Sequence, residues 1–232
     1  MISRDITYYI NYFLDNICPP ILRDCKWFMY PIIYGAYKQE TKHLMAFKEK
    51  LPFLNEEEIA SYYQRIEHVP ITRRPTDLNK ASLKYIIKHI IMGGGGGILD
   101  AACGRGYLLN KVIEAYPKAK CIGVDIVPSK QQFEVVKADL LSLPFEDHAF
   151  DTVLCTHALE HIREHKKALN ELIRVTKQRL IIVVPRQREY VYTVDLHVHF
   201  FPYMYSFQQF IGIKDAIYLE LKGDFLCCID FK

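Results

Sequence analysis

Two patterns of apolar positions divide the chain near residue 90. Before that point, apolar and aromatic side chains recur every three or four residues, a spacing that puts them on one face of a helix. Ile59, Tyr62, Tyr63 and Ile66 show it well. After that point, short apolar runs alternate with segments of helical length. The pattern predicts a helical, aromatic-rich N-terminal extension over residues 1–90 and an α/β domain over residues 91–232.

Local signals mark where two of the N-terminal helices begin. Asn55 is followed by three glutamates, and this order is typical of an N-cap with acidic residues in the first turn. A further helix is predicted over 78–92, with Thr76 or Asp77 as its cap. Prolines interrupt the helices because proline lacks an amide donor.

Seven strands are predicted in the second region. They lie at 97–101, 121–125, 134–138, 152–156, 180–184, 216–221 and 225–231. The first five are separated by segments long enough for helical crossovers, so they should form a parallel sheet covered by helices on both faces. Lys222-Gly223-Asp224 is a turn signal, which makes the last two strands an antiparallel hairpin.

The composition is typical of a globular protein and excludes few classes of function. The 232 residues carry a net charge of +3, with 25% charged and 13% aromatic side chains. Charge alone therefore gives no reason to expect nucleic-acid binding. Seven cysteines without a C-x-x-C pair fit reduced thiols, no secretory signal is evident, and the longest uncharged run, 196–213, is too polar for a membrane span. We expect a cytoplasmic protein.

The turn after the first strand of the sheet carries the functional argument. Gly104 and Gly106 stand between an apolar strand and a helix, where glycine lets the backbone approach a ligand closely. Asp125 ends the next strand, 21 residues after Gly104, near the spacing at which an acidic side chain meets a nucleoside ribose. Asp139 ends the third strand. The three strand ends together predict a nucleoside site.

The motifs resemble those of the class I S-adenosylmethionine-dependent methyltransferases, in their small-molecule branch. A dinucleotide fingerprint would place a third glycine at Leu109, which disfavours NAD or FAD. The family's D-x-G-x-G-x-G motif is matched by Asp100, Gly104 and Gly106, with Ala102 in place of the first glycine. Segments 143–153 (LPFEDHAFDTV), 158–162 (ALEHI) and 199–201 (HFF) are also similar to family motifs. The resemblance implies a Rossmann-like fold with a seven-stranded, mostly parallel sheet and an antiparallel terminal hairpin.

The resemblance also implies the contacts of an S-adenosylmethionine cofactor. Asp100 and the turn from Ala102 through Gly104 to Gly106 would hold the methionine portion, and Asp125 the ribose. The adenine would lie against Ile126, with Asp139 and the Leu140 amide at its edge. Thr156 and His157 would border the methyl group, and Arg74, chosen from its position and charge, would pair with the cofactor carboxylate.

The expected reaction is methyl transfer to the oxygen, nitrogen or carbon atom of a small acceptor, apolar or lipid-linked. A hydroxyl acceptor needs a base, and His157 or His161 could supply one near neutral pH. Two other readings stay open. One is a silent cofactor-binding module that acts as an interaction subunit. The other is a zinc hydrolase, because His157, Glu160 and His161 have the H-x-x-E-H spacing.

The N-terminal extension offers the best clue to the acceptor. Residues 27–37 are rich in aromatic side chains and are flanked by Lys26 and Lys38. Such a segment suits peripheral contact with a membrane, the lining of an apolar pocket, or a lid packed on the sheet domain. No Asn/Asp-Pro-Pro-Tyr/Phe motif or Pro-Cys pair follows the fourth predicted strand, so nucleic-acid acceptors are not expected. Neither a resident metal nor an oligomeric state is predicted.

Overall fold

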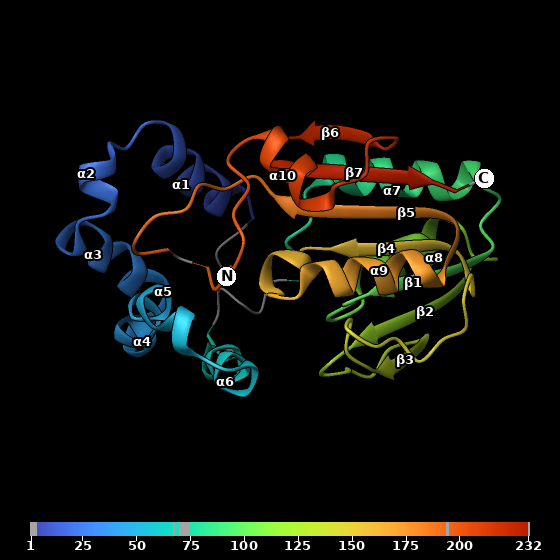
Figure 1. Ribbon diagram of the computed structural model, residues 1–232, viewed down its shortest axis with the longest axis horizontal. Helices are drawn as coiled ribbons and strands as arrows, with labels where there is room; N and C mark the ends of the chain where they lie inside the picture. Colours follow the sequence, from blue (N-terminus) through green and yellow to red (C-terminus); the bar gives the residue numbers. More distant parts are fainter. Residues whose placement is uncertain (1–3, 67, 70–74, 194, 232) are drawn as a thin grey trace. The chain divides into compact units, whose positions relative to one another are not determined.

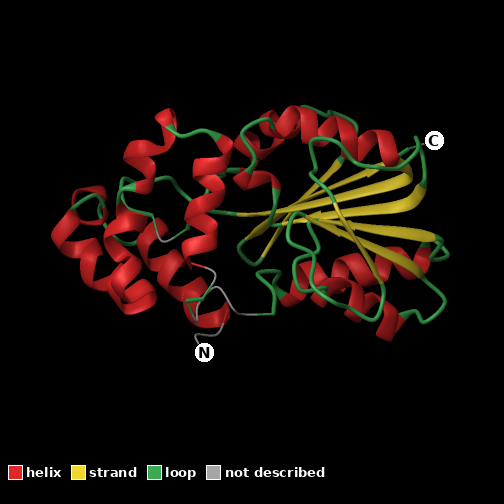
Figure 2. Cartoon of the chain, turned by 90° about the horizontal axis from the view of Figure 1, so that it is seen from below, coloured by secondary structure: helices red, strands yellow, loops and turns green. Residues whose placement is uncertain are grey.

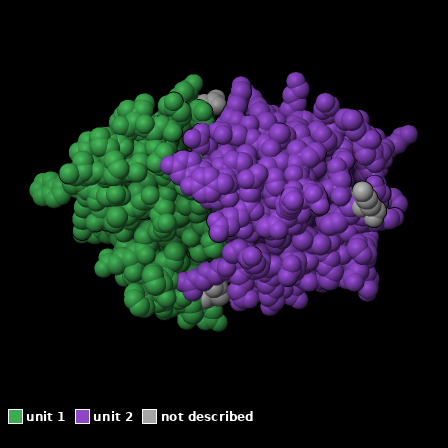
Figure 3. All heavy atoms as spheres, turned by 45° about the horizontal axis from the view of Figure 1, so that its top comes forward, with its two compact units in different colours: residues 1–74, 187–202 green, residues 75–186, 203–232 purple. Residues whose placement is uncertain are grey.

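The computed structural model describes residues 4–66, 68–69, 75–193 and 195–231. The chain divides into two compact units (Figure 3). A helical unit is made of residues 1–74 and 187–202, and a sheet unit of residues 75–186 and 203–232.

The helical unit is built from short helices. They are α1 (Arg4–Asn16), α2 (Pro20–Arg23), α3 (Lys26–Tyr37), α4 (Thr41–Met45), α5 (Phe47–Lys50) and α6 (Glu56–Ile66), with 3-10 turns η1 (Lys38–Glu40) and η2 (Leu51–Phe53). Their apolar stripes meet in one core, which includes Leu14, Met29, Ile33, Phe47 and Tyr62. The expected cap of α6 is confirmed. Asn55 Oδ1 accepts a hydrogen bond from Glu58 N at 2.9 Å, and Glu58 Oε2 accepts one from Asn55 N at 2.8 Å.

A late segment of the chain, residues 187–202, completes the core of the helical unit. Tyr190 and Leu196 are buried in it. The Tyr63 hydroxyl donates to Leu196 O at 2.6 Å, and Asp15 Oδ1 accepts from the Arg188 amide at 3.2 Å. The sequence pattern carried no sign of this return. The expected division at residue 90 therefore differs from the compact units, whose first boundary lies at residue 74.

The sheet unit contains one seven-stranded sheet in the order β3-β2-β1-β4-β5-β7-β6 (Figure 1). The strands are β1 (Gly97–Ala101), β2 (Lys120–Asp125), β3 (Glu134–Lys137), β4 (Phe150–Thr156), β5 (Thr176–Pro185), β6 (Ile217–Leu221) and β7 (Asp224–Asp230). The first five strands pair in parallel, and β7 pairs antiparallel with β5 and β6. The Rossmann-like fold and the terminal hairpin are thus confirmed.

Helices cover both faces of this sheet (Figure 2). They are α7 (Lys80–Met92), α8 (Tyr107–Ala115), α9 (His165–Val175) and α10 (Met204–Ile211), with a 3-10 turn η4 (Leu159–His161). Helix α7 belongs to this unit because its buried stripe, Ile86 and Ile90, packs in one core with Ile98, Leu109 and Ile181.

Two details of the sheet unit differ from the expectations. The cap of α7 is Asn79, whose Oδ1 accepts from the amides of Ala81 and Ser82 at 2.8 and 2.9 Å. Thr76 instead accepts from the Leu78 amide at 3.0 Å, one turn earlier. Strand β5 is longer than predicted because it starts directly after α9, at Thr176.

All seven cysteines lie among the described residues, and none of them is in a disulfide. Of the helices that the structure describes, none combines the length and the apolar character needed to cross a lipid bilayer.

Candidate functional site

The turn between β1 and α8 has the backbone that its small residues predict. Ala102, Gly104 and Gly106 have φ angles of 69°, 52° and 70°, in the left-handed region that glycine tolerates best. The two glycines differ in their surroundings. A Cβ added to Gly104 would meet no atom within 4 Å, whereas one added to Gly106 would lie 2.6 Å from Phe133 Cζ. The turn is thus open at Gly104 and packed against other side chains at Gly106.

Asp125 lies directly against this turn. Its Oδ2 accepts a hydrogen bond from the Gly104 amide at 2.8 Å, and its Oδ1 accepts one from the Val127 amide at 3.0 Å. Each carboxylate oxygen has a second lone pair, so both can still accept from a vicinal diol. The predicted meeting of the first two strand ends is therefore present.

Asp139 joins the same edge of the sheet. The Ala138 amide donates to Asp125 O at 3.2 Å, which continues the β2–β3 ladder up to Asp139. Asp139 is exposed, and its Oδ1 accepts from the Leu141 amide at 2.9 Å. The Leu140 side chain is buried, so only its backbone can face a ligand. The three predicted positions, Gly104, Asp125 and Asp139, lie at one edge.

An apolar surface borders this edge. Ile126 and Val127 are 61% and 68% exposed, which is unusual for large apolar side chains that directly follow a buried strand. Ile126 is therefore accessible for the apolar contact that the resemblance implies. Ser129, which the sequence reasoning missed, donates its hydroxyl to Gly104 O at 3.2 Å and braces the turn.

Asp100 is a buried carboxyl near the end of strand β1, which leads to this edge. It is 1% exposed, and its Oδ1 has no hydrogen-bond partner among the described residues. Burial, with a smaller contribution from the charge of Asp125, raises the pKa of Asp100 to about 7. A buried carboxyl without a partner is costly, and a cationic ligand would relieve this cost. The residues present therefore fit a ligand that joins an ammonium or sulfonium group to a nucleoside.

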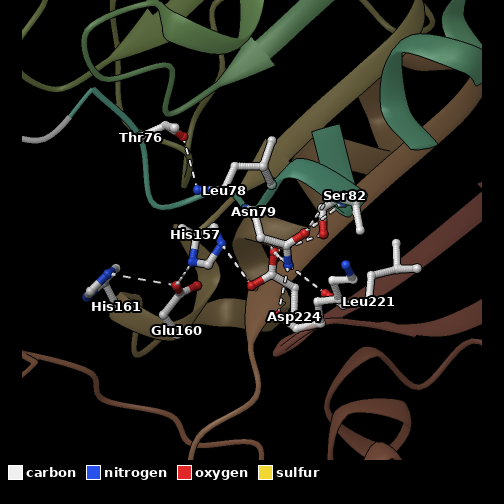
Figure 4. A network of polar contacts seen from close by, with 11 residues as sticks. Thr76, Leu78, Asn79, Ser82, His157, Glu160, His161, Leu221 and Asp224 are labelled. Carbon is white, nitrogen blue, oxygen red and sulfur yellow. Dashed lines mark hydrogen bonds and ion pairs between the residues drawn. The ribbon is translucent and has the colours of Figure 1, made fainter. Parts of the chain in front are cut away.

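Strand β4 ends in a second polar cluster (Figure 4). Thr156, partly buried, is its last residue, and His157 follows with a φ of 53°. The His157 amide donates to Val183 O at 2.8 Å, which holds the residue beside β5. Its Nδ1 lies 3.5 Å from Glu160 Oε1, and its Nε2 lies 3.6 Å from Asp224 Oδ1. Both carboxylate side chains are fully buried.

This cluster changes the expected role of His157. Burial alone lowers the pKa of the imidazole, but Asp224 and Glu160 outweigh burial and raise the pKa to about 10. A ring that already holds its proton at neutral pH cannot accept another. The expected use of His157 as a general base therefore does not fit the structure, and the side chain acts as a buried cation between two carboxylates.

The zinc alternative meets a geometric obstacle. The H-x-x-E-H motif needs both histidines on one helical face, but residues 159–161 form a single 3-10 turn and His157 lies outside it. His157 turns both ring nitrogens toward carboxylates instead. His161 is the more accessible histidine, with a side chain 28% exposed and Nε2 4.0 Å from Glu160 Oε1.

Asp224, which the sequence reasoning treated as a turn residue, organises the cluster. Its Oδ2 accepts from Asn79 Nδ2 at 2.7 Å and from the Ser82 hydroxyl at 2.8 Å. Asn79 Nδ2 also donates to Leu221 O at 2.5 Å. The start of α7 is thus tied to the β6–β7 turn and, through His157, to the end of β4 (Figure 4). Arg74, the expected partner of the cofactor carboxylate, lies outside the described residues.

Comparison with known proteins finds relatives for the segment that contains this site. Residues 99–184 match the family described as a methyltransferase domain. A ubiquinone/menaquinone biosynthesis C-methyltransferase from Syntrophotalea carbinolica is 27% identical over 111 residues, which are 42% of this chain and 47% of that protein. A demethylmenaquinone methyltransferase from Thermus thermophilus is 36% identical over 90 residues, 34% of this chain and 41% of that protein.

An ajmaline N-methyltransferase from Rauvolfia serpentina is 31% identical over 103 residues, 38% of this chain and 34% of that protein. The chain thus spans less than half the length of these curated relatives. Among solved structures, a SAM-dependent methyltransferase from Aquifex aeolicus aligns with a TM-score of 0.51 at 17% identity, over 75% of this chain and 97% of that one. This likeness shows the fold, and residues 99–184 are similar to the methyltransferase domain family.

Proposed function

We propose, from the methyltransferase domain at residues 99–184, that the protein transfers a methyl group from S-adenosylmethionine to a small apolar acceptor. The observation that carries the proposal is the 2.8 Å hydrogen bond between the Gly104 amide and Asp125, on the open side of a left-handed turn. It joins two strand ends at the position where a nucleoside binds in such sheets.

The residues of the edge divide the binding work by their chemistry. Asp100 would pair with the ammonium of the methionine portion, because it is a buried carboxyl without a hydrogen-bond partner at Oδ1. Asp125 would accept from the ribose hydroxyls, and Ile126 would pack on the adenine. The turn from Ala102 to Gly106 would follow the methionine backbone, with Asp139 and the Leu140 amide at the adenine edge.

The bound cofactor supplies an activated methyl group on a sulfonium. The work left to the protein is to hold the acceptor in line and to exclude water, effects worth up to ~7–11 kcal/mol in favourable cases. Thr156, the last residue of β4, would border the transferred methyl group. If the acceptor is a hydroxyl, His161 is the candidate base, since His157 is held as a cation.

The relatives support an apolar ring compound as the acceptor. One of them is named for ubiquinone/menaquinone biosynthesis, one for demethylmenaquinone and one for N-methylation of ajmaline. The aromatic-rich helical unit, which lies outside the matched domain, is the part of the chain that we assign to acceptor selection. A quinol carbon and an amine nitrogen are thus the first acceptor atoms to test.

Calorimetry with S-adenosylhomocysteine tests the cofactor site. We expect the unmodified protein to bind it and Asp125→Asn to bind at least about tenfold more weakly, because hydrogen bonds to a charged carboxylate are lost. Glu114→Gln removes a surface carboxylate of α8 that is 61% exposed and should leave the affinity unchanged. No binding by the unmodified protein, or equal binding by Asp125→Asn, would overturn the site.

Turnover separates an enzyme from a silent cofactor-binding module. The assay measures release of S-adenosylhomocysteine with demethylated quinols, phenols, and cyclic amines as acceptors. Product with one acceptor class supports the proposed function. Cofactor binding without product from any class would favour the silent module.

A further inference from the structure

The outer face of helix α3 is aromatic and exposed. Trp27, Tyr30 and Tyr34 are 89%, 36% and 47% exposed, and their spacing of three and four residues places them on one side of the helix. The buried stripe of the same helix is formed by Met29, Ile33 and Tyr37. The outer face of a helix in a water-soluble protein normally carries charged and polar side chains instead.

The only charges along this helix are positive. Residues 25–39 contain no aspartate or glutamate, and Lys26 and Lys38 stand at the two ends of the helix. Lys38 Nζ lies 5.4 Å from the centre of the Tyr34 ring, and the rings of Tyr30 and Tyr34 stack at 6.0 Å. Asp24, just before the helix, already accepts a hydrogen bond from the Val191 amide at 3.0 Å.

A second apolar group precedes the helix. Ile21, in α2, is 82% exposed and follows Pro19 and Pro20, which have no amide hydrogens to be hydrated. The short segment therefore presents an aliphatic side chain immediately before the aromatic helix. Five large apolar side chains within one short stretch, counting the half-exposed Leu22, form more apolar surface than isolated exposed residues explain.

We propose that this α3 face, formed by Lys26, Trp27, Tyr30, Tyr34 and Lys38, docks on the surface of an anionic lipid bilayer. Tryptophan and tyrosine favour the headgroup level because each has an apolar ring and a polar atom. Lysines at both ends would pair with anionic headgroups while their stems lie on the apolar layer. Because none of the described helices can cross a bilayer, the contact is superficial.

Bilayer docking rests on the proposed function in one respect only. If the acceptor is an apolar ring compound, docking would bring the protein to the phase in which that compound dissolves. The docking itself depends on the α3 face and not on methyl transfer.

Trp27 is the only tryptophan of the chain, so its fluorescence reports on the α3 face alone. The full-length protein is titrated with neutral phosphatidylcholine vesicles and with vesicles that contain about 30% phosphatidylglycerol. We expect a blue shift with the anionic vesicles, quenching by lipids brominated in their acyl chains, and weaker binding in about 0.5 M salt. Unchanged emission together with no co-sedimentation would overturn the proposal.

Substitutions that keep Trp27 as the probe assign the contact to residues. Lys26→Glu with Lys38→Glu should weaken binding to anionic vesicles at least about tenfold, as should Tyr30→Ser with Tyr34→Ser. Phe53→Ser is the matched control, because Phe53 is 87% exposed but lies outside α3. Equal loss in the Phe53→Ser control would overturn the assignment to α3.

Two other occupants of the face give distinct results. A blue shift that grows with protein concentration in the absence of vesicles would show that a second copy covers the face. A blue-shifted emission already present in dilute protein would show that the chain itself covers it. Either result overturns membrane docking. Binding of S-adenosylhomocysteine should be unaffected by all of these substitutions, so the docking proposal and the proposed function can fail separately.

Discussion

The imidazole of His157, at the end of β4, lies with its Nε2 3.6 Å from Oδ1 of Asp224, the first residue of β7. The other ring nitrogen faces Glu160 at 3.5 Å. One buried cation thus stands between two buried carboxylates, and it connects the end of β4 to the hairpin of β6 and β7. Its strained backbone, with a φ of 53°, is kept by these contacts.

Loss of the His157 cation should be costly. His157→Gln leaves two buried carboxylates without their shared cation, so we expect a loss of about 3–5 kcal/mol in the free energy of unfolding at pH 6. His157→Gln with Asp224→Asn should recover part of this loss. His148→Gln is the control, because His148 has a similar φ of 56° but is exposed. Chemical denaturation measures all three, and a loss in His157→Gln no larger than in the control would contradict the cluster.

The same histidine should make stability depend on alkaline pH. Its pKa is raised in the folded protein from the ordinary 6.5 to about 10, so the folded state holds the proton more tightly than the unfolded chain. The stabilisation is complete below about pH 6.5 and is lost as the pH rises through 10. The stability difference between the unmodified protein and His157→Gln should therefore shrink from pH 6 to pH 10. A constant difference would argue against a charged His157.

Asp100 should also make stability fall as the pH rises, but over a lower pH range than His157. Its pKa is raised to about 7 by burial, so the folded protein binds this proton more tightly and loses stability as the pH rises from about 4 to 7. Asp100→Asn should remove this loss, a change on the order of 2–4 kcal/mol between pH 4 and 8. Thermal and urea unfolding at several pH values measure it.

The affinity for the cofactor should depend on the ionisation of Asp100. The Asp100 carboxylate binds an ammonium group only when it is ionised, so affinity for S-adenosylhomocysteine should rise from pH 6 to pH 8 in the unmodified protein. Asp100→Asn should bind more weakly and with little dependence on pH. If both proteins show the same slope in calorimetry, Asp100 does not hold the amine.

Substitution of the two turn glycines should lower different properties of the protein. Gly106→Ala puts a Cβ 2.6 Å from Phe133 Cζ at a φ of 70°, so it should lose about 2–4 kcal/mol of stability. Gly104→Ala meets no neighbour within 4 Å and should lose only about 1 kcal/mol, but its methyl group stands on the open side of the turn. We expect its affinity for S-adenosylhomocysteine to fall about tenfold. Unchanged affinity would show that the ligand does not cover Gly104.

Arg174 in α9 should hold the loop before β4. Its guanidinium donates to Glu171, to Asp147 and to the carbonyl oxygens of Phe145 and Leu143 at 2.7–3.0 Å. Arg174→Met should therefore cost about 1–3 kcal/mol. Lys177→Met is a suitable control because Lys177 is 61% exposed and reaches Asp151 only at 3.8 Å, so it should cost less than about 0.5 kcal/mol. Similar melting temperatures for both variants would refute this role.

The sequence by itself determined the sheet and the cofactor edge. Strand periodicity, crossover length and the hairpin signal predict five parallel strands and an antiparallel pair, which the structure confirms. The positions of Gly104, Asp125 and Asp139 follow from the rule that parallel strands end at one edge. These features depend on residues close in sequence, whose turn chemistry and period are local properties.

Only the tertiary structure decided what the polar residues do. The contact of Asp224 with Ser82 spans 142 positions, and that of Tyr63 with Leu196 spans 133. No periodicity encodes such pairs, because they arise when packed elements bring distant side chains together. The expectation that His157 is a base was made without knowledge of these distant contacts. Its type suggested proton transfer, but its pKa depends on two carboxylates, one of which, Asp224, folding delivers from another strand.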